Sequence, residues 1–201
     1  MIIVGLTGGI GSGKSTVSEY LKSKNYFISD ADKIAHDILE PGMPALAKLV
    51  LAFGNEILDE HGRLKRKKLA EIAFADRNKE QTLNQITHGQ IKEQILKEIE
   101  ICKEAGEKIM FLDIPLLFEQ GLDKWCDVSW AIVVDQEIRI KRVLARDDIK
   151  ESDVRARIDC QMADDQKKKL ADEVLDNSFS KEELYRQIDE LLVKYEQRKE
   201  N

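Results

Sequence analysis

The chain has 201 residues, 42% of them hydrophobic and 35% charged, which is enough to bury one compact core under a heavily charged surface. Its net charge of -6 argues against a nucleic-acid binder that works by bulk electrostatic attraction. Three cysteines without close spacing do not form a disulfide framework, and no stretch is apolar for long enough to be a signal-peptide core or a membrane span. We therefore expect a cytoplasmic protein.

The first predicted element is a strand at residues 2–6, a short apolar run that ends in a glycine-rich turn. Similar runs lie at residues 26–28, 109–112 and 130–134, with a weaker one at residues 173–175. Continuous apolar runs are typical of strands buried on both faces of a parallel sheet, and helical patterns lie between them. The alternation predicts an α/β fold of three layers around a parallel five-stranded sheet.

The turn after the first strand reads GGIGSGKS at residues 8–15 and matches the phosphate-binding pattern GxxxxGK[ST] in full. Glycines let the backbone amides wrap around phosphate oxygens at the positive end of the following helix. In such a loop Lys14 contacts the β- and γ-phosphates of ATP, and the Ser15 hydroxyl binds Mg²⁺. A turn without a ligand is the alternative. The motif predicts a P-loop NTPase fold that binds nucleotide through Gly9, Gly11, Ser12, Gly13, Lys14, Ser15 and Thr16.

Two acids, Asp30 and Asp32, follow the second predicted strand. Ligands of α/β folds bind at this edge of the sheet, so either carboxylate is placed to accept a proton from an attacking hydroxyl. Either one is equally placed to cap the next helix. The pattern by itself leaves both assignments open.

Residues 31–105 contain no convincing strand, although a crossover between parallel strands needs only about a dozen residues. Their pattern is helical and ends in a long charged run at residues 79–104, which predicts an inserted helical subdomain. The basic residues at 63–68 are interpreted as a solvated helix start in preference to an anion site.

Asp113 follows the strand at residues 109–112 and completes the Walker B pattern, in which a carboxylate steadies Mg²⁺. Capping of the turn at Pro115 is the rival explanation. Together with the phosphate loop, the pattern favours Ser15 and Asp113 as metal ligands.

Residues 136–162 are rich in Arg, Lys and Asp, and form either a mobile cover over an active site or an exposed pair of helices. Arg139, Arg142 and Arg146 recur at helical spacing and share one helix face. Such a stripe usually faces water, but in a phosphotransferase it also neutralises the charge of the transferring group. The last predicted element is an amphipathic, structural helix at residues 181–199.

Several segments together resemble the dephospho-CoA kinase family, in the right order and nearly from end to end. The glycine loop is common to many kinases, whereas DAD at residues 30–32 and PLLFE at residues 115–119 are more distinctive. The segments are LTGGIGSGKST at residues 6–16, DAD followed by IAH at residues 34–36, PLLFE, Arg142 through Arg146-Asp147, Arg157-Ile158 with Gln161, and Ala171-Asp172 with Asn177.

The resemblance implies an enzyme that transfers the γ-phosphoryl group of ATP to the ribose 3′-hydroxyl of dephospho-CoA. It implies that Asp32 is the general base and that Lys14 and Arg142 are further catalytic groups. Arg146 and Asn177 are implied to contact the nucleotide. The acceptor substrate is assigned to Asp32, His88 and Leu116.

One departure from the family pattern concerns His88, because Gly89 stands where the family usually has proline. Glycine loosens a helix that proline would stiffen at its start. His88 as a plain surface residue is the alternative to a contact with the substrate.

The implied organisation is a nucleotide-binding core of residues 1–30, 106–135 and 163–201, a CoA-binding subdomain of residues 31–105 and a lid of residues 136–162. The expected partners are ATP with Mg²⁺ and dephospho-CoA, without nucleic acid or membrane, for a monomer or weak homo-oligomer.

A nucleoside monophosphate kinase shares these features and is the nearest rival. A GTPase switch would carry an Asn-Lys-x-Asp segment, which this sequence lacks. An ATP-binding module without chemistry is disfavoured by Asp32 and the arginines.

Overall fold

A parallel sheet organises the computed structural model, which describes residues 1–197. Its five strands lie in the order β2-β3-β1-β4-β5, with parallel pairing of β1 to β3, β1 to β4 and β4 to β5. The sequence-based prediction of a parallel five-stranded sheet is confirmed. The strands are β1 (Ile2–Gly8), β2 (Phe27–Asp30), β3 (Ile109–Asp113), β4 (Val128–Val133) and β5 (Glu173–Asp176).

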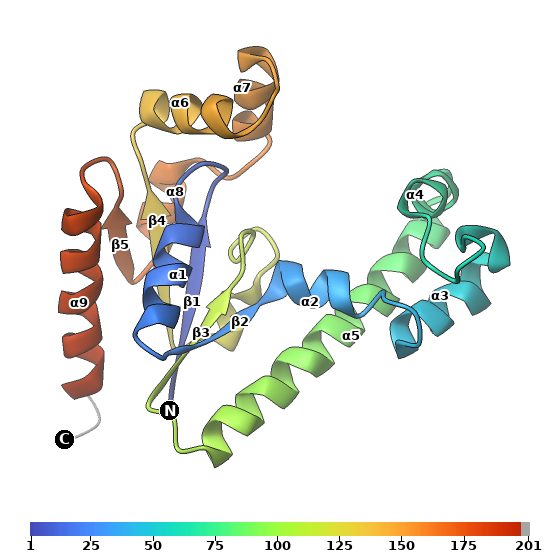
Figure 1. Cartoon of the computed structure of the whole chain (residues 1–201), viewed down its shortest axis with the longest axis horizontal. Helices are drawn as coiled ribbons and strands as arrows, with labels where there is room; N and C mark the ends of the chain where they lie inside the picture. The colour runs from blue at the N-terminus through green and yellow to red at the C-terminus, as the bar shows by residue number, and fades with distance from the viewer. Residues whose placement is uncertain (198–201) are drawn as a thin grey trace. The chain divides into compact units, whose positions relative to one another are not determined.

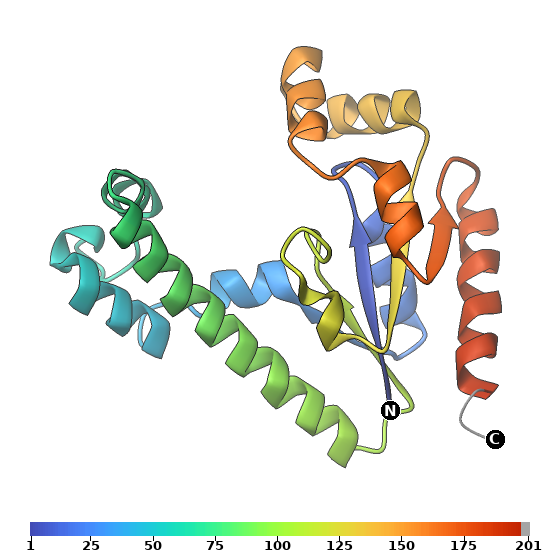
Figure 2. The same ribbon diagram turned by 180° about the vertical axis from the view of Figure 1, so that it is seen from behind.

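Helices cover both faces of this sheet. Helices α1 and α9 lie on the face turned toward the viewer in Figure 1, and α8 lies on the opposite face, seen from behind in Figure 2. Helices α6 and α7 pack against each other beyond the carboxyl end of β4. The helices are α1 (Lys14–Ser23), α6 (Gln136–Arg146), α7 (Glu151–Asp159), α8 (Asp164–Leu170) and α9 (Lys181–Gln197), with a 3₁₀ turn η2 (Leu122–Trp125).

The core of the sheet explains why the central strands are continuously apolar. Every residue of β3 and of β4 is buried, and Trp130 and Phe111 meet edge to face with ring centroids 5.4 Å apart. Strand β1 lies between these two strands and pairs Ile2 with Ile109 and Val4 with Val128. A strand covered on both faces cannot alternate apolar and polar residues, which is why apolar runs predicted it.

The chain divides into two compact units, here called unit 1 (residues 1–29 and from Cys102 onward) and unit 2 (Asp30–Ile101). Unit 2 is helical, and within residues 31–105 the β-structure is one isolated bridge between Leu58 and Leu64. Its core is formed by Leu39, Ala45, Leu49, Phe53, Ile57, Leu69 and Ala73. Its helices are α2 (Ala31–Asp37), α3 (Pro44–Phe53), α4 (Arg66–Phe74) and α5 (Arg77–Glu104), with a 3₁₀ turn η1 (Asn55–Ile57).

Element ends differ slightly from the sequence-based expectation. Helix α5 begins at Arg77, two residues before the expected run, and its buried Cys102 belongs to unit 1. Helix α9 is described to Gln197, so residues 198 and 199 of the expected last helix lie outside the described part.

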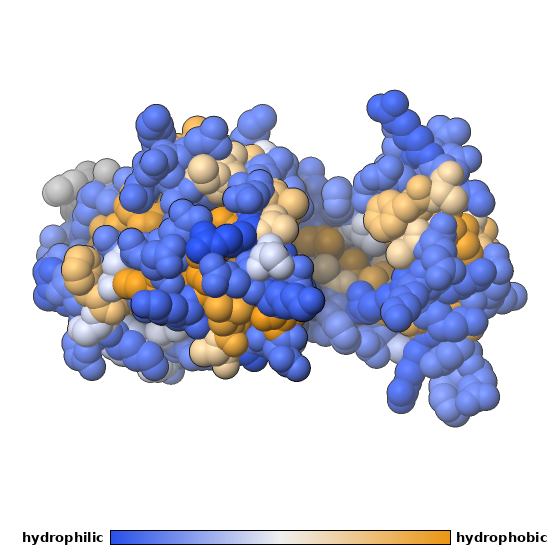
Figure 3. All heavy atoms as spheres, turned by 90° about the horizontal axis from the view of Figure 1, so that it is seen from above, coloured by the Kyte–Doolittle hydropathy of each residue, from blue (hydrophilic) through white to orange (hydrophobic). Residues whose placement is uncertain are grey.

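Hydrophilic side chains cover most of the face of each unit that is visible in Figure 3, with smaller apolar patches between them. Among residues 1–197, no helix combines the length and the apolar character needed to cross a membrane.

Candidate active site

The phosphate loop joins β1 to α1 in a conformation that depends on its glycines. Gly13 caps the start of α1 with φ 90°, and Gly11 also has a positive φ of 72°. A Cβ atom at Gly13 would lie 2.0 Å from Nδ2 of Asn177, which real Cβ atoms do not tolerate. Gly13 is therefore required both by its backbone conformation and by the close approach of Asn177.

Asp113 at the end of β3 points at this loop. Its side chain is 5% exposed, forms an ion pair with Lys14, and accepts a hydrogen bond of 2.6 Å from the Ser18 hydroxyl. The structure thus brings together the predicted Walker A lysine and the predicted Walker B acid. Sequence reasoning missed Ser18, although its position one helical turn after Lys14 places it on the same face of α1.

Asn177 lies on the other side of the loop, just after β5. Its side-chain amide donates a 2.8 Å hydrogen bond to the carbonyl oxygen of Ser12, and its backbone N–H donates to Val133 at 2.8 Å. The residue is 5% exposed. Asn177 therefore supports the loop backbone, which is a structural role that the expectation of a nucleotide contact did not include.

The three arginines of α6 differ in their surroundings. Arg139 is buried and pairs with Asp164 on α8, whereas the exposed Arg146 pairs with Asp147. The hydrogen bond to Asp147 raises the pKa of Arg146, and the same bond lowers the pKa of Asp147. The alternative of a stripe that faces water along its whole length does not describe Arg139.

Arg142 lies nearest to the end of the loop. Its half-buried guanidinium places Nη1 3.9 Å from where a Cβ of Gly13 would lie. That Nη1 atom is buried without a hydrogen-bond partner in the structure. A buried cationic N–H without an acceptor is costly, so this atom is suited to receive an anion beside the loop.

Asp30 and Asp32 follow β2, and the structure distinguishes them. Asp30 is the N-cap of α2, because its carboxylate accepts a 3.0 Å hydrogen bond from the backbone N–H of Lys33. Asp32 lies in the first turn of α2 and is exposed. The capping role, which the sequence left open for either acid, therefore belongs to Asp30.

The other two residues predicted to contact the acceptor lie in different settings. His88 is exposed in the middle of α5, and a side chain at the adjacent Gly89 would meet nothing within 4 Å. Leu116 is half-buried in the PLLFE segment after β3, which the Thr7 hydroxyl holds by a 2.9 Å hydrogen bond to the Pro115 carbonyl.

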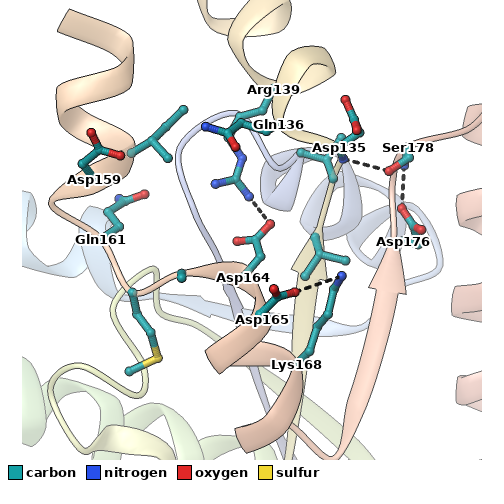
Figure 4. Close-up of a pocket in the computed structure, with 15 residues that line it drawn as sticks. Asp135, Gln136, Arg139, Asp159, Gln161, Asp164, Asp165, Lys168, Asp176 and Ser178 are labelled. Atoms are coloured by element: carbon teal, nitrogen blue, oxygen red, sulfur yellow. Dashed lines mark hydrogen bonds and ion pairs between the residues drawn. The ribbon is translucent and has the colours of Figure 1, made fainter.

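A cavity of about 650 Å³ lies beneath α6 and α7, on the α8 side of the loop. Figure 4 shows Arg139 reaching from α6 to Asp164, and Gln161 on the chain that leaves α7. Arg139 and Lys168 are the cations of a lining that also holds five carboxylates, so a polyphosphate would be repelled there. The acids are Asp135, Asp159, Asp164, Asp165 and Asp176. The side of the loop that carries Arg142 is the better place for phosphate.

The comparisons with known proteins agree with this geometry. A sequence profile described as dephospho-CoA kinase matches residues 2–183. A dephospho-CoA kinase from Corynebacterium glutamicum is 46% identical over 184 residues, which cover 92% of this chain and 94% of that protein. This chain belongs to the dephospho-CoA kinase family. It is accordingly a kinase, an enzyme class that uses ATP with a divalent metal.

Solved structures show the same fold. A Thermus thermophilus protein named TT1252 superimposes with a TM-score of 0.79 at 34% identity, covering 96% of this chain and 97% of its own. Dephospho-CoA kinase from Campylobacter jejuni superimposes with a TM-score of 0.71 at 29% identity, covering 96% of both chains. The predicted P-loop kinase fold is confirmed.

Proposed function

We propose that this chain transfers the γ-phosphoryl group of ATP to the ribose 3′-hydroxyl of dephospho-CoA, giving coenzyme A and ADP. Membership of the dephospho-CoA kinase family supports ATP and dephospho-CoA as the two substrates. The observation that carries the chemistry is the buried, unpartnered Nη1 of Arg142 beside the phosphate loop. Phosphoryl transfer depends on positioned cations of this kind, because charge spreads over the oxygens of the transferring group.

The residues present fit a Mg²⁺ ion. The Asp113 carboxylate and the Ser15 hydroxyl provide the hard oxygen atoms that Mg²⁺ prefers. Within residues 1–197 no group of three or more His, Cys, Asp or Glu side chains is arranged to hold a metal ion. Mg²⁺ in P-loop kinases takes one or two protein oxygens and completes its shell with water and substrate phosphates. When bound, it neutralises charge on the β- and γ-phosphates.

Lys14 is proposed to exchange its partner when ATP binds. In the structure its ammonium group pairs with Asp113. The β- and γ-phosphates offer it a stronger, multiply charged partner, and its departure leaves the Asp113 carboxylate available to the metal. Arg142 and Arg146 then approach the phosphates from α6, with residues 136–162 as the lid.

Asp32 is proposed as the general base, with unit 2 as the acceptor-binding part and His88 and Leu116 as contacts to dephospho-CoA. The 3′-oxygen forms a bond to the γ-phosphorus while the bond from that phosphorus to the β,γ-bridging oxygen breaks, and ADP leaves. The hydroxyl proton passes to the Asp32 carboxylate. Asp30 caps α2 through the backbone N–H of Lys33, and the resemblance to the family assigns the role of base to Asp32.

The experiment is a direct assay of purified enzyme with ATP, Mg²⁺ and dephospho-CoA, beside a panel of nucleoside monophosphates. We expect phosphorylation of dephospho-CoA alone. Turnover of a monophosphate with dephospho-CoA left unchanged would overturn the proposal. The proposal also places a monomer or weak homo-oligomer in the cytoplasm without nucleic-acid partners, and sedimentation of the purified enzyme tests the oligomeric part.

A further inference from the structure

Gln161 contacts the phosphate loop although it lies far from the loop in the sequence, as Asn177 also does. Its carboxamide Oε1 accepts a 2.8 Å hydrogen bond from the backbone N–H of Ile10, which lies 151 residues earlier in the sequence. Ile10 is the residue between Gly9 and Gly11, in the middle of the loop. Gln161 thus holds one of the loop amides whose orientation shapes a phosphate-binding loop.

The backbone that carries Gln161 is itself held in place. Gln161 follows the last residues of α7, and its N–H donates to the Ile158 carbonyl at 3.0 Å. The next residue, Met162, donates its N–H to Glu119 at 3.2 Å. The Glu119 carboxylate also pairs at 3.0 Å with the fully buried Lys167. The Gln161 side chain therefore extends from a fixed point to the loop.

The loop is shaped to admit this side chain. A Cβ atom at Gly9 would lie 3.1 Å from Oε1 of Gln161 and 3.2 Å from Nη1 of Arg139. Gly9 does not have the positive φ of Gly11 and Gly13, so backbone conformation does not demand a glycine there. Gly9 instead leaves room for Gln161 and Arg139 to pack against the loop.

We propose that Gln161 is a positioning residue, which holds the Ile10 amide and keeps the loop in its nucleotide-binding shape. The inference rests on the proposed role of the loop in binding ATP. Without the Gln161 carboxamide oxygen, the Ile10 amide loses its hydrogen-bond partner and the loop relaxes. ATP must then reorder the loop, which lowers its binding affinity.

The test replaces Gln161 by methionine, Q161M, which keeps the length of the side chain and removes the carboxamide oxygen. The matched control is Q166M at an exposed glutamine of α8. Loss of one hydrogen bond predicts a rise of about threefold to tenfold in the KM for ATP and in the Kd for ADP. The KM for dephospho-CoA is expected to stay unchanged, and Q166M is expected to match the wild type in all three constants.

A higher KM for ATP and a higher Kd for ADP in Q161M, with an unchanged KM for dephospho-CoA, support the proposal. Equal loss toward both substrates, or a lower melting temperature with unchanged ADP affinity, would show a purely structural role and overturn it. Absence of ATP binding by the wild type would instead refute the proposed function.

A measurement on the wild type keeps the proposal testable if Q161M does not fold. Hydrogen exchange of the Ile10 amide in enzyme without added nucleotide is expected to be slower by about tenfold or more than in an unstructured peptide, since the hydrogen bond to Gln161 must open first. Exchange at the unprotected rate would show that the contact is not held in solution and would overturn the proposal.

Discussion

The surroundings of the phosphate loop in unit 1 contrast with those of Asp32 and His88 in unit 2. The loop is held by buried or half-buried side chains from β3, the segment after α7 and the segment after β5. Asp32 and His88 are exposed on helices. The proposed nucleotide half of the site is therefore built from packed side chains, whereas the residues proposed for the acceptor half are exposed to solvent. Changes near the loop should disturb nucleotide binding, and changes at Asp32 should disturb turnover.

The largest effect is expected at Asp32. We predict that Asp32→Asn lowers kcat by about 10²–10⁴-fold, the usual contribution of a general base, and leaves the Kd for ADP unchanged. The control Asp30→Ala removes the cap of α2 and should cost about 1 kcal/mol of stability with turnover largely kept. Steady-state kinetics and calorimetry measure both. If Asp30→Ala loses turnover while Asp32→Asn keeps it, Asp30 and not Asp32 is the base.

A second large effect is expected at Gly13. Gly13→Ala places a Cβ 2.0 Å from Nδ2 of Asn177 and also requires an alanine at φ 90°. The loop must shift, so we predict a rise of about a hundredfold or more in the Kd for ADP, comparable to the loss of a strong electrostatic contact. Isothermal titration calorimetry measures it. Nearly normal ADP binding would show that the loop accommodates a side chain at Gly13, and so that it is packed less tightly than the distance to Asn177 implies.

A smaller effect concerns the packing beneath β1. Burial, with Asp123 and Asp127 nearby, raises the pKa of the Cys126 thiol to about 12. The thiol of the unfolded chain has an ordinary pKa near 9, whereas the pKa of the folded thiol is about 12. The unfolded state therefore loses a proton first, and stability falls as pH rises through this window, by at most about 1.4 kcal/mol per pH unit.

Cys126→Ala should remove this part of the alkaline decline, whatever its effect on stability at pH 7. Urea unfolding of both proteins between pH 8 and pH 10.5 measures the difference in slope. Parallel curves would mean that the folded thiol ionises near its ordinary pKa, and so that this region is open to water.

The smallest effect is expected in unit 2 and has the opposite sign to that at Gly13. Gly89 lies inside α5, where an added Cβ meets nothing within 4 Å. We predict that Gly89→Ala stabilises the protein by about 0.5–1 kcal/mol, because glycine is a poor helix former. Chemical denaturation measures the gain. A lower stability of Gly89→Ala would indicate that a side chain at this position is unfavourable for a reason other than helix propensity.

Prediction from sequence succeeded for the fold and the family, because the patterns that indicate them are local. The glycines of the loop, Lys14, and the acid that ends β3 lie within short patterns whose physical reasons are carried by neighbouring residues. The contacts of Gln161 and Asn177 join residues 151 and 165 positions apart, and only folding brings them together. No local pattern distinguishes a glutamine that supports a loop from one that faces water.

The arginines of α6 show the same limit in another way. Their spacing correctly placed them on one helix, but the partner of the buried Arg139 is Asp164, which belongs to a different helix, α8. Asp30 and Asp32 were equivalent in sequence because both precede or begin a helix. The structure separates them through a single backbone hydrogen bond to Lys33.

The strand order has a consequence for synthesis on the ribosome. Strand β1 pairs with β3 and β4, so Ile2 has no strand partner until Ile109 has been made. The core of unit 2, from Leu39 to Ala73, is contained in a much shorter stretch and has all its members earlier. The apolar β1 therefore emerges from the ribosome unpaired, and it stays unpaired while the helices of unit 2 become able to fold. That interval is when the unpaired β1 is most exposed to aggregation, and when a chaperone would protect it most.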